Sequence, residues 1–303
     1  MEYTVGFLGF GEAASEFASG FREERWTGRM VAYDPKASVP PYGERIAERA
    51  RRANVELLAA AAEVGRVADI VFSANSAAVA VEVANGVAPS LRRGVLYADI
   101  NATSPKTKEE AARSVEAHGG VFVDVAVMGP VPIGRHKTPL LLSGPGAERF
   151  LEVFGPFGVR AKVVGDRPGM ASAIKMIRSV YMKGLAMLLY ESLEAAYRCG
   201  VTDTVVESIG ETMYEVPFPQ LVRRLVCGTA VHAKRRTAEM DEVLETLKAL
   251  GSPSSMAAAT RQSLDRLVQL GLPERYGGRT PGEVAEVLEA LVELEAAGRP
   301  RTS

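Results

Sequence analysis

The sequence predicts an α/β fold class, with a doubly wound sheet in the first half of the chain and an all-helical region in the second half. Three observations predict it. A short apolar run, Val5 to Leu8, leads into the motif G-x-G-x-x-A, which ends at Ala14. Short β-branched runs then alternate with amphipathic segments, as expected for a mostly parallel sheet. Beyond Gly165–Gly169 only helical periodicity with intervening breakers remains.

The expected strands are short runs rich in β-branched and apolar residues, in chain order Thr4–Leu8, Met30–Tyr33, Asp69–Ser73, Val95–Ile100, Val121–Val125, Leu140–Ser143 and Lys162–Val164. The amphipathic stretches between them predict helices, in chain order Ala13–Glu24, Glu44–Ala53, Val79–Ala88 and Pro105–Ala117. This alternation predicts a Rossmann-type, doubly wound domain over residues 1–167.

The second half predicts an all-α domain over residues 168–298, followed by a disordered tail, 299–303. Its first helix, Met170–Arg198, carries apolar residues on more than one face, which is typical of a helix buried in a core or a subunit interface. The later helices are expected at Thr204–Met213, Phe218–Cys227, Ala230–Leu250, Ser254–Leu270 and Pro281–Ala297.

The glycine motif after the first strand has the spacing of a pyrophosphate cradle. Gly9 permits a tight turn, Gly11 lets the backbone approach a phosphate, and Ala14 lets the helix pack closely on the strand. The start of the helix adds unpaired N–H groups and the positive end of its dipole. We therefore predict that a dinucleotide cofactor binds to the loop formed by Gly9, Phe10, Gly11, Glu12, Ala13 and Ala14.

Two polar residues at strand ends extend this predicted cofactor site. Asp34 closes the second strand about 20 positions after Ala14, the spacing of a carboxylate that binds the ribose hydroxyls. It favours NAD, because a carboxylate repels a 2′-phosphate, while the nearby Lys36 leaves NADP possible. Asn75 follows a later strand, where its loop would border the cofactor; a plain loop is the alternative.

Composition limits the class of protein. A chain of 303 residues can form two domains with a large core, and its net charge of −1 creates no global field toward nucleic acid or an anionic membrane. Cys199 and Cys227 provide neither a disulfide framework nor metal-ligand spacing, and no apolar stretch is long enough to span a bilayer. We expect a cytoplasmic protein without a metal site, nucleic-acid partner or membrane span.

Four segments of the chain are similar to one known family: Gly6–Ala14, Asp99–Pro105, Asp124–Gly134 and Gly169–Ser179. With the helical second half, they resemble the β-hydroxyacid dehydrogenase superfamily, which includes 3-hydroxyisobutyrate and 6-phosphogluconate dehydrogenases. The resemblance implies a helical domain that forms a homodimer and an active site in the cleft between domains. It also implies NAD or NADP as cofactor and a small hydroxy acid, or its phosphate, as substrate.

The second and third segments imply contacts with that substrate. The family's counterpart of Asp99–Pro105 lies near the nicotinamide and the substrate, so the resemblance gives Asn101 a role toward both. In the third segment the family's Ser-Gly-Gly pattern is replaced by Met128, Gly129 and Pro130. The serine hydroxyl is therefore missing here, and Gly129 can still offer its N–H to a substrate carboxylate.

The fourth segment resembles the family's catalytic helix, in which a Lys is followed four residues later by an Asn. Lys175 fits the Lys and Ser179 stands in the Asn position. Residues four apart share a helix face, and a lysine with a lowered pKa can exchange a proton with the substrate hydroxyl. The resemblance implies that Lys175 is the general acid/base and that Ser179 orients the substrate. The structural alternatives are a snorkelling surface lysine and a serine that bonds its own backbone.

A charged cluster in the second half is a further candidate for substrate binding. His232, Arg235, Arg236 and Glu239 recur at three- or four-residue steps, so several can share a helix face and bind an anion such as a carboxylate or phosphate. A solvated helix face with ordinary ion pairs is the alternative.

Taken with the resemblance, these residues predict a dehydrogenase that transfers a hydride between a nicotinamide cofactor and a small β-hydroxy acid. Three alternatives stay open: an imine reductase, a cofactor-binding regulator without turnover, and an oxidative decarboxylase. The family's imine reductases usually lack a lysine at the position of Lys175. Decarboxylating members carry a Glu where this chain has Met182, which disfavours that reaction.

Overall fold

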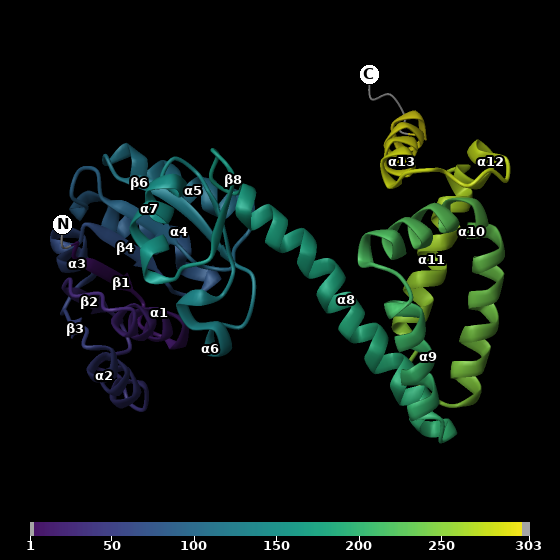
Figure 1. The fold of residues 1–303 in the computed structure, drawn as a ribbon, viewed down its shortest axis with the longest axis horizontal. Helices are drawn as coiled ribbons and strands as arrows, with labels where there is room; N and C mark the ends of the chain where they lie inside the picture. The colour runs from purple at the N-terminus through teal and green to yellow at the C-terminus, as the bar shows by residue number, and fades with distance from the viewer. Residues whose placement is uncertain (1–2, 299–303) are drawn as a thin grey trace. The chain divides into compact units, whose positions relative to one another are not determined.

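The computed structural model describes residues 3–298 and divides into two units, with the boundary between Val180 and Tyr181 in helix α8 (Figure 1). Each unit has hydrophobic clusters of its own. The expected domain limits, 1–167 and 168–298, stay a prediction. The expected tail, 299–303, lies outside the described residues.

The first unit is built on one eight-stranded sheet with the order β3-β2-β1-β4-β5-β6-β7-β8. Its strands are β1 (Val5–Leu8), β2 (Met30–Tyr33), β3 (Glu56–Leu57), β4 (Ile70–Ser73), β5 (Leu96–Asp99), β6 (Val121–Val127), β7 (Leu140–Ser143) and β8 (Ala161–Gly165). All neighbouring strands are parallel except β6 and β7, whose connection holds only the short helix α6 (Val131–Gly134) and a 3-10 turn. The predicted doubly wound, mostly parallel sheet is confirmed.

Helices cover both faces of this sheet (Figure 1). Those on one face are α1 (Glu12–Glu23), α2 (Tyr42–Ala53) and α7 (Ala147–Phe154), and those on the other face are α3 (Ala61–Val67), α4 (Ala80–Val87) and α5 (Pro105–Ala117). Successive strand residues point to opposite faces, so Phe7 belongs to one core and Leu8 to the other. Because both faces are covered, the strands read as continuous apolar runs rather than alternating ones.

Aromatic side chains dominate the core beneath α1 and α7. The rings of Phe21 and Phe154 stack with centroids 4.9 Å apart, and both rings also contact Phe72 from β4. Burying one such side chain contributes about 1.5–3 kcal/mol, and favourable ring geometry adds to it. This cluster fixes α1, the helix that starts at the glycine motif, against the sheet.

The second unit is all-helical, as predicted. Its helices, after the shared α8 (Met170–Cys199), are α9 (Thr202–Tyr214), α10 (Phe218–Ala249), α11 (Ser255–Gln269), α12 (Leu272–Tyr276) and α13 (Val284–Gly298). No strand lies between residues 166 and 298. Among the helices of residues 3–298, none combines the length and the apolar character needed to cross a membrane.

One helix prediction was wrong. The sequence suggested two helices, Phe218–Cys227 and Ala230–Leu250, whereas α10 continues through Gly228 without a break. A glycine inside a helix costs only about 1 kcal/mol relative to alanine. Cys227 and Ala230, on either side of it, are both buried in one cluster with residues of α12 and α13, and this packing keeps the helix continuous.

The sequence interpretation also missed several short elements. These are the two-residue strand β3 and the helices α3, α6, α7 and α12. Elements this short hold too few periods of the apolar pattern to be distinguished from loops.

Candidate functional site

A pocket of about 560 Å³ lies where the sheet's strand order reverses, between β1 and β4. It is lined by the ends of β1, β2 and β4 and by residues of α4, among them Gly9, Gly11, Asp34, Asn75 and Val83. Reversal points at the carboxyl ends of parallel strands are the usual ligand sites of such sheets. Gly9, Gly11, Asp34 and Asn75, which the sequence assigned to the cofactor, thus line a single cavity.

The two glycines of the motif serve different purposes in the structure. Gly9 has φ +87°, and a Cβ there would lie 2.4 Å from the carbonyl oxygen of Ala74, so this position requires glycine. A Cβ on Gly11 would meet nothing within 4 Å. That open space lies beside the start of α1, where N–H groups and the helix dipole favour an anion. The loop therefore fits a pyrophosphate.

The other residues of the glycine loop have distinct surroundings. Phe10 is fully buried in the core, so only its backbone can face a ligand. Glu12 is exposed and Ala13 half-buried, whereas Ala14 is buried against the sheet. Ala14 thus has the packing role that the motif predicts.

Asp34 is fixed by two backbone N–H groups. Its Oδ2 accepts a hydrogen bond from the N–H of Phe10 (2.8 Å), and its Oδ1 accepts one from the N–H of Lys36 (2.9 Å). The Lys36 ammonium lies 4.7 Å from the ring centroid of Tyr42. The carboxylate is thus held at the end of β2, in the pocket, while a cation–π contact directs the lysine to Tyr42.

Asn75 and Asn101 join the pocket to the interior of the sheet. The N–H of Asn75 donates to Oδ1 of Asn101 (2.7 Å). The side-chain amide of Asn101 donates in turn to Oδ1 of Asp99 (2.7 Å) and to Oγ of Ser73 (3.0 Å). Asn101 is buried, so its amide is held in one orientation behind the pocket-lining Asn75.

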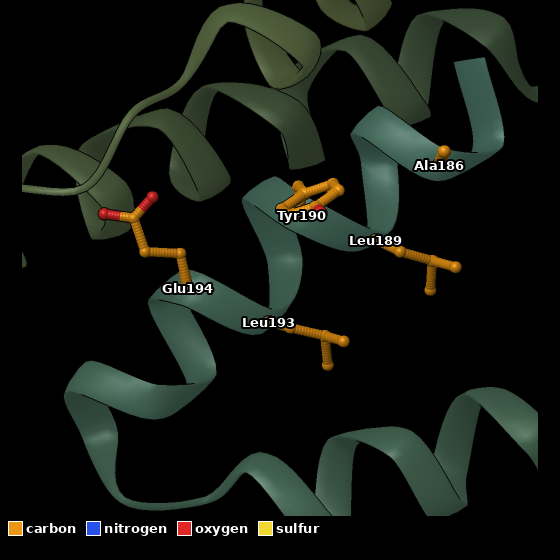
Figure 2. A pocket seen from close by; sticks show the side chains of 5 residues that line it. All are labelled: Ala186, Leu189, Tyr190, Leu193 and Glu194. Atoms are coloured by element: carbon orange, nitrogen blue, oxygen red, sulfur yellow. The ribbon is translucent and has the colours of Figure 1, made fainter. Parts of the chain in front are cut away.

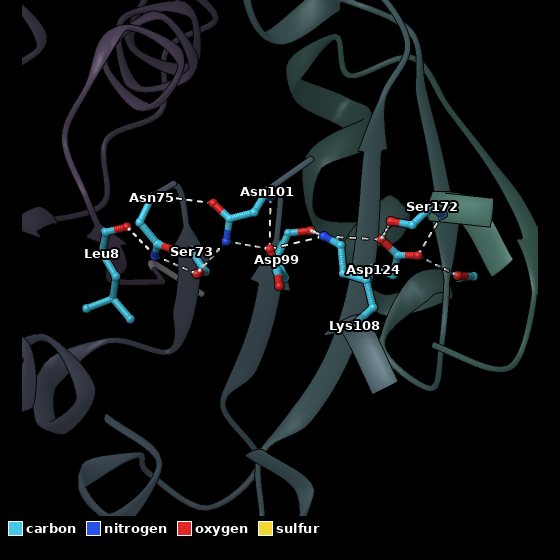
Figure 3. A network of polar contacts seen from close by, with 9 residues as sticks. Leu8, Ser73, Asn75, Asp99, Asn101, Lys108, Asp124 and Ser172 are labelled. Carbon is cyan, nitrogen blue, oxygen red and sulfur yellow. Dashed lines mark hydrogen bonds and ion pairs between the residues drawn. The ribbon is translucent and has the colours of Figure 1, made fainter. Parts of the chain in front are cut away.

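Behind Asn101 lies a fully buried charge cluster, which we call the Asp99–Lys108–Asp124 cluster (Figure 3). The Nζ of Lys108 is 2.7 Å from the carbonyl oxygen of Asp99, 3.0 Å from its Oδ1 and 3.3 Å from Oδ1 of Asp124. Burial and the negative charge of Asp99 raise the pKa of the nearby Tyr97, which therefore stays neutral.

Sequence reasoning did not identify this cluster, although one signal was available. Lys108 falls on the buried face of α5 with Ala111, Ala112 and Val115, at the spacing of an apolar stripe. A lysine is almost never fully buried unless it is paired. A lysine in an apolar stripe, together with aspartates in two neighbouring strands, therefore indicated a buried ion pair.

Asp124 connects this cluster to the start of α8. Its Oδ2 accepts from the N–H of Ser172 (2.9 Å), and its Oδ1 accepts from the Ser172 hydroxyl (2.7 Å). The Ser143 hydroxyl donates to Oδ2 (3.3 Å) and accepts from the N–H of Ala171 (2.9 Å). Asp124 and Ser143 thereby satisfy N–H groups in the first turn of α8 that lack intrahelical acceptors.

Lys175 follows Ser172 by three residues on the same helix and is half-buried. Ser179, four residues further along, donates its hydroxyl to the carbonyl oxygen of Lys175 (2.9 Å). This is the backbone bond that the structural alternative for Ser179 expects. Its oxygen remains able to accept a hydrogen bond.

The loop that follows β6 contains Met128, Gly129 and Pro130. Met128 is half-buried, and its N–H donates to the carbonyl oxygen of Pro139 (2.9 Å). Gly129 and Pro130 are exposed and precede α6.

Only two of the four charged residues predicted on α10 line a common pocket. Arg236 and Glu239 line a pocket of about 650 Å³ with residues of α11, and Arg236 bonds the Thr229 hydroxyl. Arg235 forms an exposed ion pair with Glu239 one turn away, and His232 is exposed. Exposed pairs of this kind contribute little to stability.

Comparison with known protein families matches both units. Residues 4–164 match the family described as the NAD binding domain of 6-phosphogluconate dehydrogenase. Residues 196–267 match a family described as a domain of unknown function (DUF1932).

Known proteins are similar over much of the chain. A solved structure described as a conserved protein of unknown function with structural similarity to 3-hydroxyacid dehydrogenases is 34% identical, with a TM-score of 0.58, covering 88% of this chain and 97% of that one. Mitochondrial 3-hydroxyisobutyrate dehydrogenase of Mus musculus is 26% identical over 68% of this chain and 60% of its own length. An imine reductase from Pseudomonas sp. shares the fold, with a TM-score of 0.74 at 18% identity, covering 96% of this chain and 100% of that one.

The glycine cradle, the pocket at the reversal point and the match over residues 4–164 agree. The chain therefore belongs to the family of the NAD binding domain of 6-phosphogluconate dehydrogenase, an NAD(P)-binding oxidoreductase family of the 3-hydroxyacid dehydrogenase type.

Proposed function

We propose that this protein is an NAD(P)-dependent dehydrogenase that transfers a hydride between the cofactor and a small β-hydroxy acid, with Lys175 as general acid/base. The observation that carries the proposal is the arrangement of α8. Its first turn is hydrogen-bonded to Asp124 of β6, and the same polar network continues through Asn101 to Asn75 in the cofactor pocket. Lys175 lies one turn beyond that attachment.

Different residues of the pocket would bind different parts of the cofactor. The N–H groups at the start of α1, beside Gly11, would bind the pyrophosphate. Asp34 would accept hydrogen bonds from the ribose hydroxyls, which favours NAD over NADP. When bound, the nicotinamide would supply the site that accepts or donates a hydride.

Lys175 would handle the proton that accompanies hydride transfer. In oxidation its neutral amine would take the proton from the substrate hydroxyl, and in reduction its ammonium would return one. Ser179 would accept a hydrogen bond from the substrate, since its own proton is directed to the carbonyl oxygen of Lys175.

Recognition of the substrate carboxylate is assigned to two groups of residues. Gly129 is an exposed residue flanked by Met128 and Pro130, and its N–H would be a suitable donor to an anion. The second group is His232, Arg235, Arg236 and Glu239. Arg236 is its half-buried cation, and it lines the pocket between α10 and α11 together with Glu239. A substrate phosphate would suit the same cations.

We also propose that the protein forms a homodimer through α8. This helix exposes large apolar side chains, of which Ile177 is 71% exposed and Val180 77%. Leu189 and Leu193 point the same way along a further pocket of about 510 Å³ (Figure 2). Several large apolar side chains exposed along one helix are typical of a protein interface.

Two alternative reactions are to be assayed beside the oxidation of hydroxy acids. The fold likeness to an imine reductase suggests reduction of a C=N bond, and oxidative decarboxylation remains the third reaction to assay. Lys175 favours the hydroxy acid, because a lysine matches the proton transfer that an alcohol requires. A regulator without turnover would bind the cofactor and convert none of these substrates.

Substitution of Lys175 tests the proposal. We expect Lys175→Ala to lower kcat by about 10³-fold with little change in the cofactor Kd, because general acid–base catalysis contributes about 10²–10⁴-fold. Lys183→Ala, an exposed lysine two turns along the same helix, serves as the control and should keep full activity. Turnover of a panel of 3-hydroxy acids is measured with each variant, and full activity of Lys175→Ala would refute the assigned role.

A further inference from the structure

Lys108 is fully buried in the first unit, although the proposed reaction does not use it. Its ammonium has three donors, and three oxygens lie around it: the carbonyl and Oδ1 of Asp99 and Oδ1 of Asp124. A lysine is almost never fully buried unless it is paired, and removing one partner of a buried ion pair leaves an uncompensated charge.

Both aspartates of the cluster accept several hydrogen bonds. Oδ1 of Asp99 accepts from the N–H and the side-chain amide of Asn101 as well as from Lys108. Asp124 accepts from Lys108, from both donors of Ser172 and from the Ser143 hydroxyl. By residue type the cluster combines two carboxyl groups with one ammonium group, which is a formal excess of one negative charge.

The first turn of α8 offsets this excess charge. Asp124 receives the N–H of Ser172 directly, and Ser143 relays the N–H of Ala171. A helix N-terminus carries about half a positive charge, which stabilises a carboxylate placed against it. The start of α8 is therefore attached to Asp124 by charge as well as by hydrogen bonds.

Lys108 stands between two sets of contacts (Figure 3). One set runs through Asp99 and Asn101 to the backbone of Asn75 in the cofactor pocket. The other runs through Asp124 to Ser172 at the start of α8. Without the ammonium, two carboxylates in a dry interior would repel each other, and the two sets would lose their common partner.

We propose that Lys108 is a positioning residue: it fixes the first turn of α8, and with it Lys175, relative to the Asn75–Asn101 edge of the cofactor pocket. The inference rests on the proposed role of Lys175. Lys108 acts from α5 through Asp99 and Asp124, and because it is fully buried it cannot reach a substrate or cofactor itself. Small displacements of a reacting group are costly, since about 1 Å can lower a rate by about 10²-fold.

The experiment compares the wild type with Lys108→Met and with the control Lys106→Met, an exposed lysine two residues earlier in the same helix. For Lys108→Met we expect kcat to fall by about 10²-fold while KM and the cofactor Kd change by less than about three-fold, because Gly9, Gly11 and Asp34 are not attached to Lys108. Amide hydrogen exchange should accelerate by about ten-fold at Ser172, whose N–H depends on Asp124. Lys106→Met should match the wild type in every measurement.

A double variant separates positioning from charge balance. Lys108→Met with Asp124→Asn leaves the same net charge as the wild type but breaks the link between the two sets of contacts. The proposal predicts that kcat stays low in this variant, whereas recovery to the wild-type value would overturn it. If Lys108→Met does not fold, the double variant and Ser172→Ala are measured instead. Ser172→Ala removes one hydrogen bond to Asp124, so it too should lower kcat.

The outcomes distinguish this inference from the proposed function. Unchanged kcat and unchanged exchange at Ser172 in folded Lys108→Met would overturn the positioning role, whatever Lys175 does. A second outcome is faster exchange at Ser172 in Lys108→Met together with full turnover of Lys175→Ala. In that case Lys108 still fixes the start of α8, but neither Lys108 nor Lys175 has the proposed effect on catalysis.

Discussion

At the scale of single residues, the two glycines of the cofactor loop are needed for different reasons, one for folding and one for binding the cofactor. Gly9 is needed for folding, because its φ of +87° and the nearby Ala74 carbonyl exclude a side chain. Gly11 is not needed for folding, because a Cβ there would point into open space. That space is the one a pyrophosphate would fill, so Gly11 is needed for the ligand.

The contrast predicts a separation of stability from binding. Gly11→Ala should leave the melting temperature within about 2 °C of the wild type but weaken cofactor binding by at least about ten-fold, because the methyl group occupies the approach to the phosphate. Calorimetric titration and thermal unfolding measure the two effects. Gly210→Ala is the matched control, because a Cβ at Gly210 also meets open space but lies in α9, outside the cofactor loop. Wild-type affinity in Gly11→Ala would place the pyrophosphate elsewhere.

At the scale of elements, α1 is held by a buried histidine that follows α6. Both ring nitrogens of His136 are buried without a hydrogen-bond partner, and the ring packs edge-on to Phe21 with centroids 5.6 Å apart. Burial lowers the pKa of His136, as do the charges of Lys137 and Arg135, and Glu24 and Glu23 oppose the shift. The unprotonated ring is therefore the form that the folded protein accommodates.

This arrangement predicts a pH-dependent stability. The unfolded chain takes up a proton at His136 below about pH 6.5, whereas the folded protein resists it, so the free energy of unfolding should fall as pH drops below that value and stay constant above it. His136→Leu should reduce the difference in urea midpoint between pH 7.5 and pH 5, and His118→Leu, at an exposed histidine, should not. An unchanged difference in His136→Leu would contradict the assignment.

At the scale of the whole molecule, much of the architecture could be predicted from local patterns. The glycine turn and the acid at the end of β2 lie close together in the sequence, and each strand or helix of the alternation is a local pattern, so the sheet and the cofactor loop could be predicted from the sequence. The Asp99–Lys108–Asp124 cluster and its bond to Ser172 could not be assembled in this way, because β6 and α8 are brought together only by the fold. The bond from the Ser179 hydroxyl to its own helix was one of two alternatives that the sequence left open, because the serine rotamer rather than the spacing decides between them.

The exposed apolar surface of α8 predicts the assembly. We expect sedimentation equilibrium to give twice the 32.4 kDa mass of one chain, because Ile177 and Val180 are too exposed for a monomer surface. Val180→Glu should shift the mass toward that of the monomer by placing a charge in the interface. Val39→Glu, at an exposed valine of the first unit, should remain a dimer. A monomeric wild type would refute the interface.

The most direct test of the central claim, that this chain is a nicotinamide-dependent oxidoreductase, is calorimetric titration of the wild-type protein with NADH and with NADPH. We predict saturable binding of one cofactor per chain, with NADH tighter, because the Asp34 carboxylate at the end of β2 repels a 2′-phosphate. Binding of neither cofactor would contradict the account.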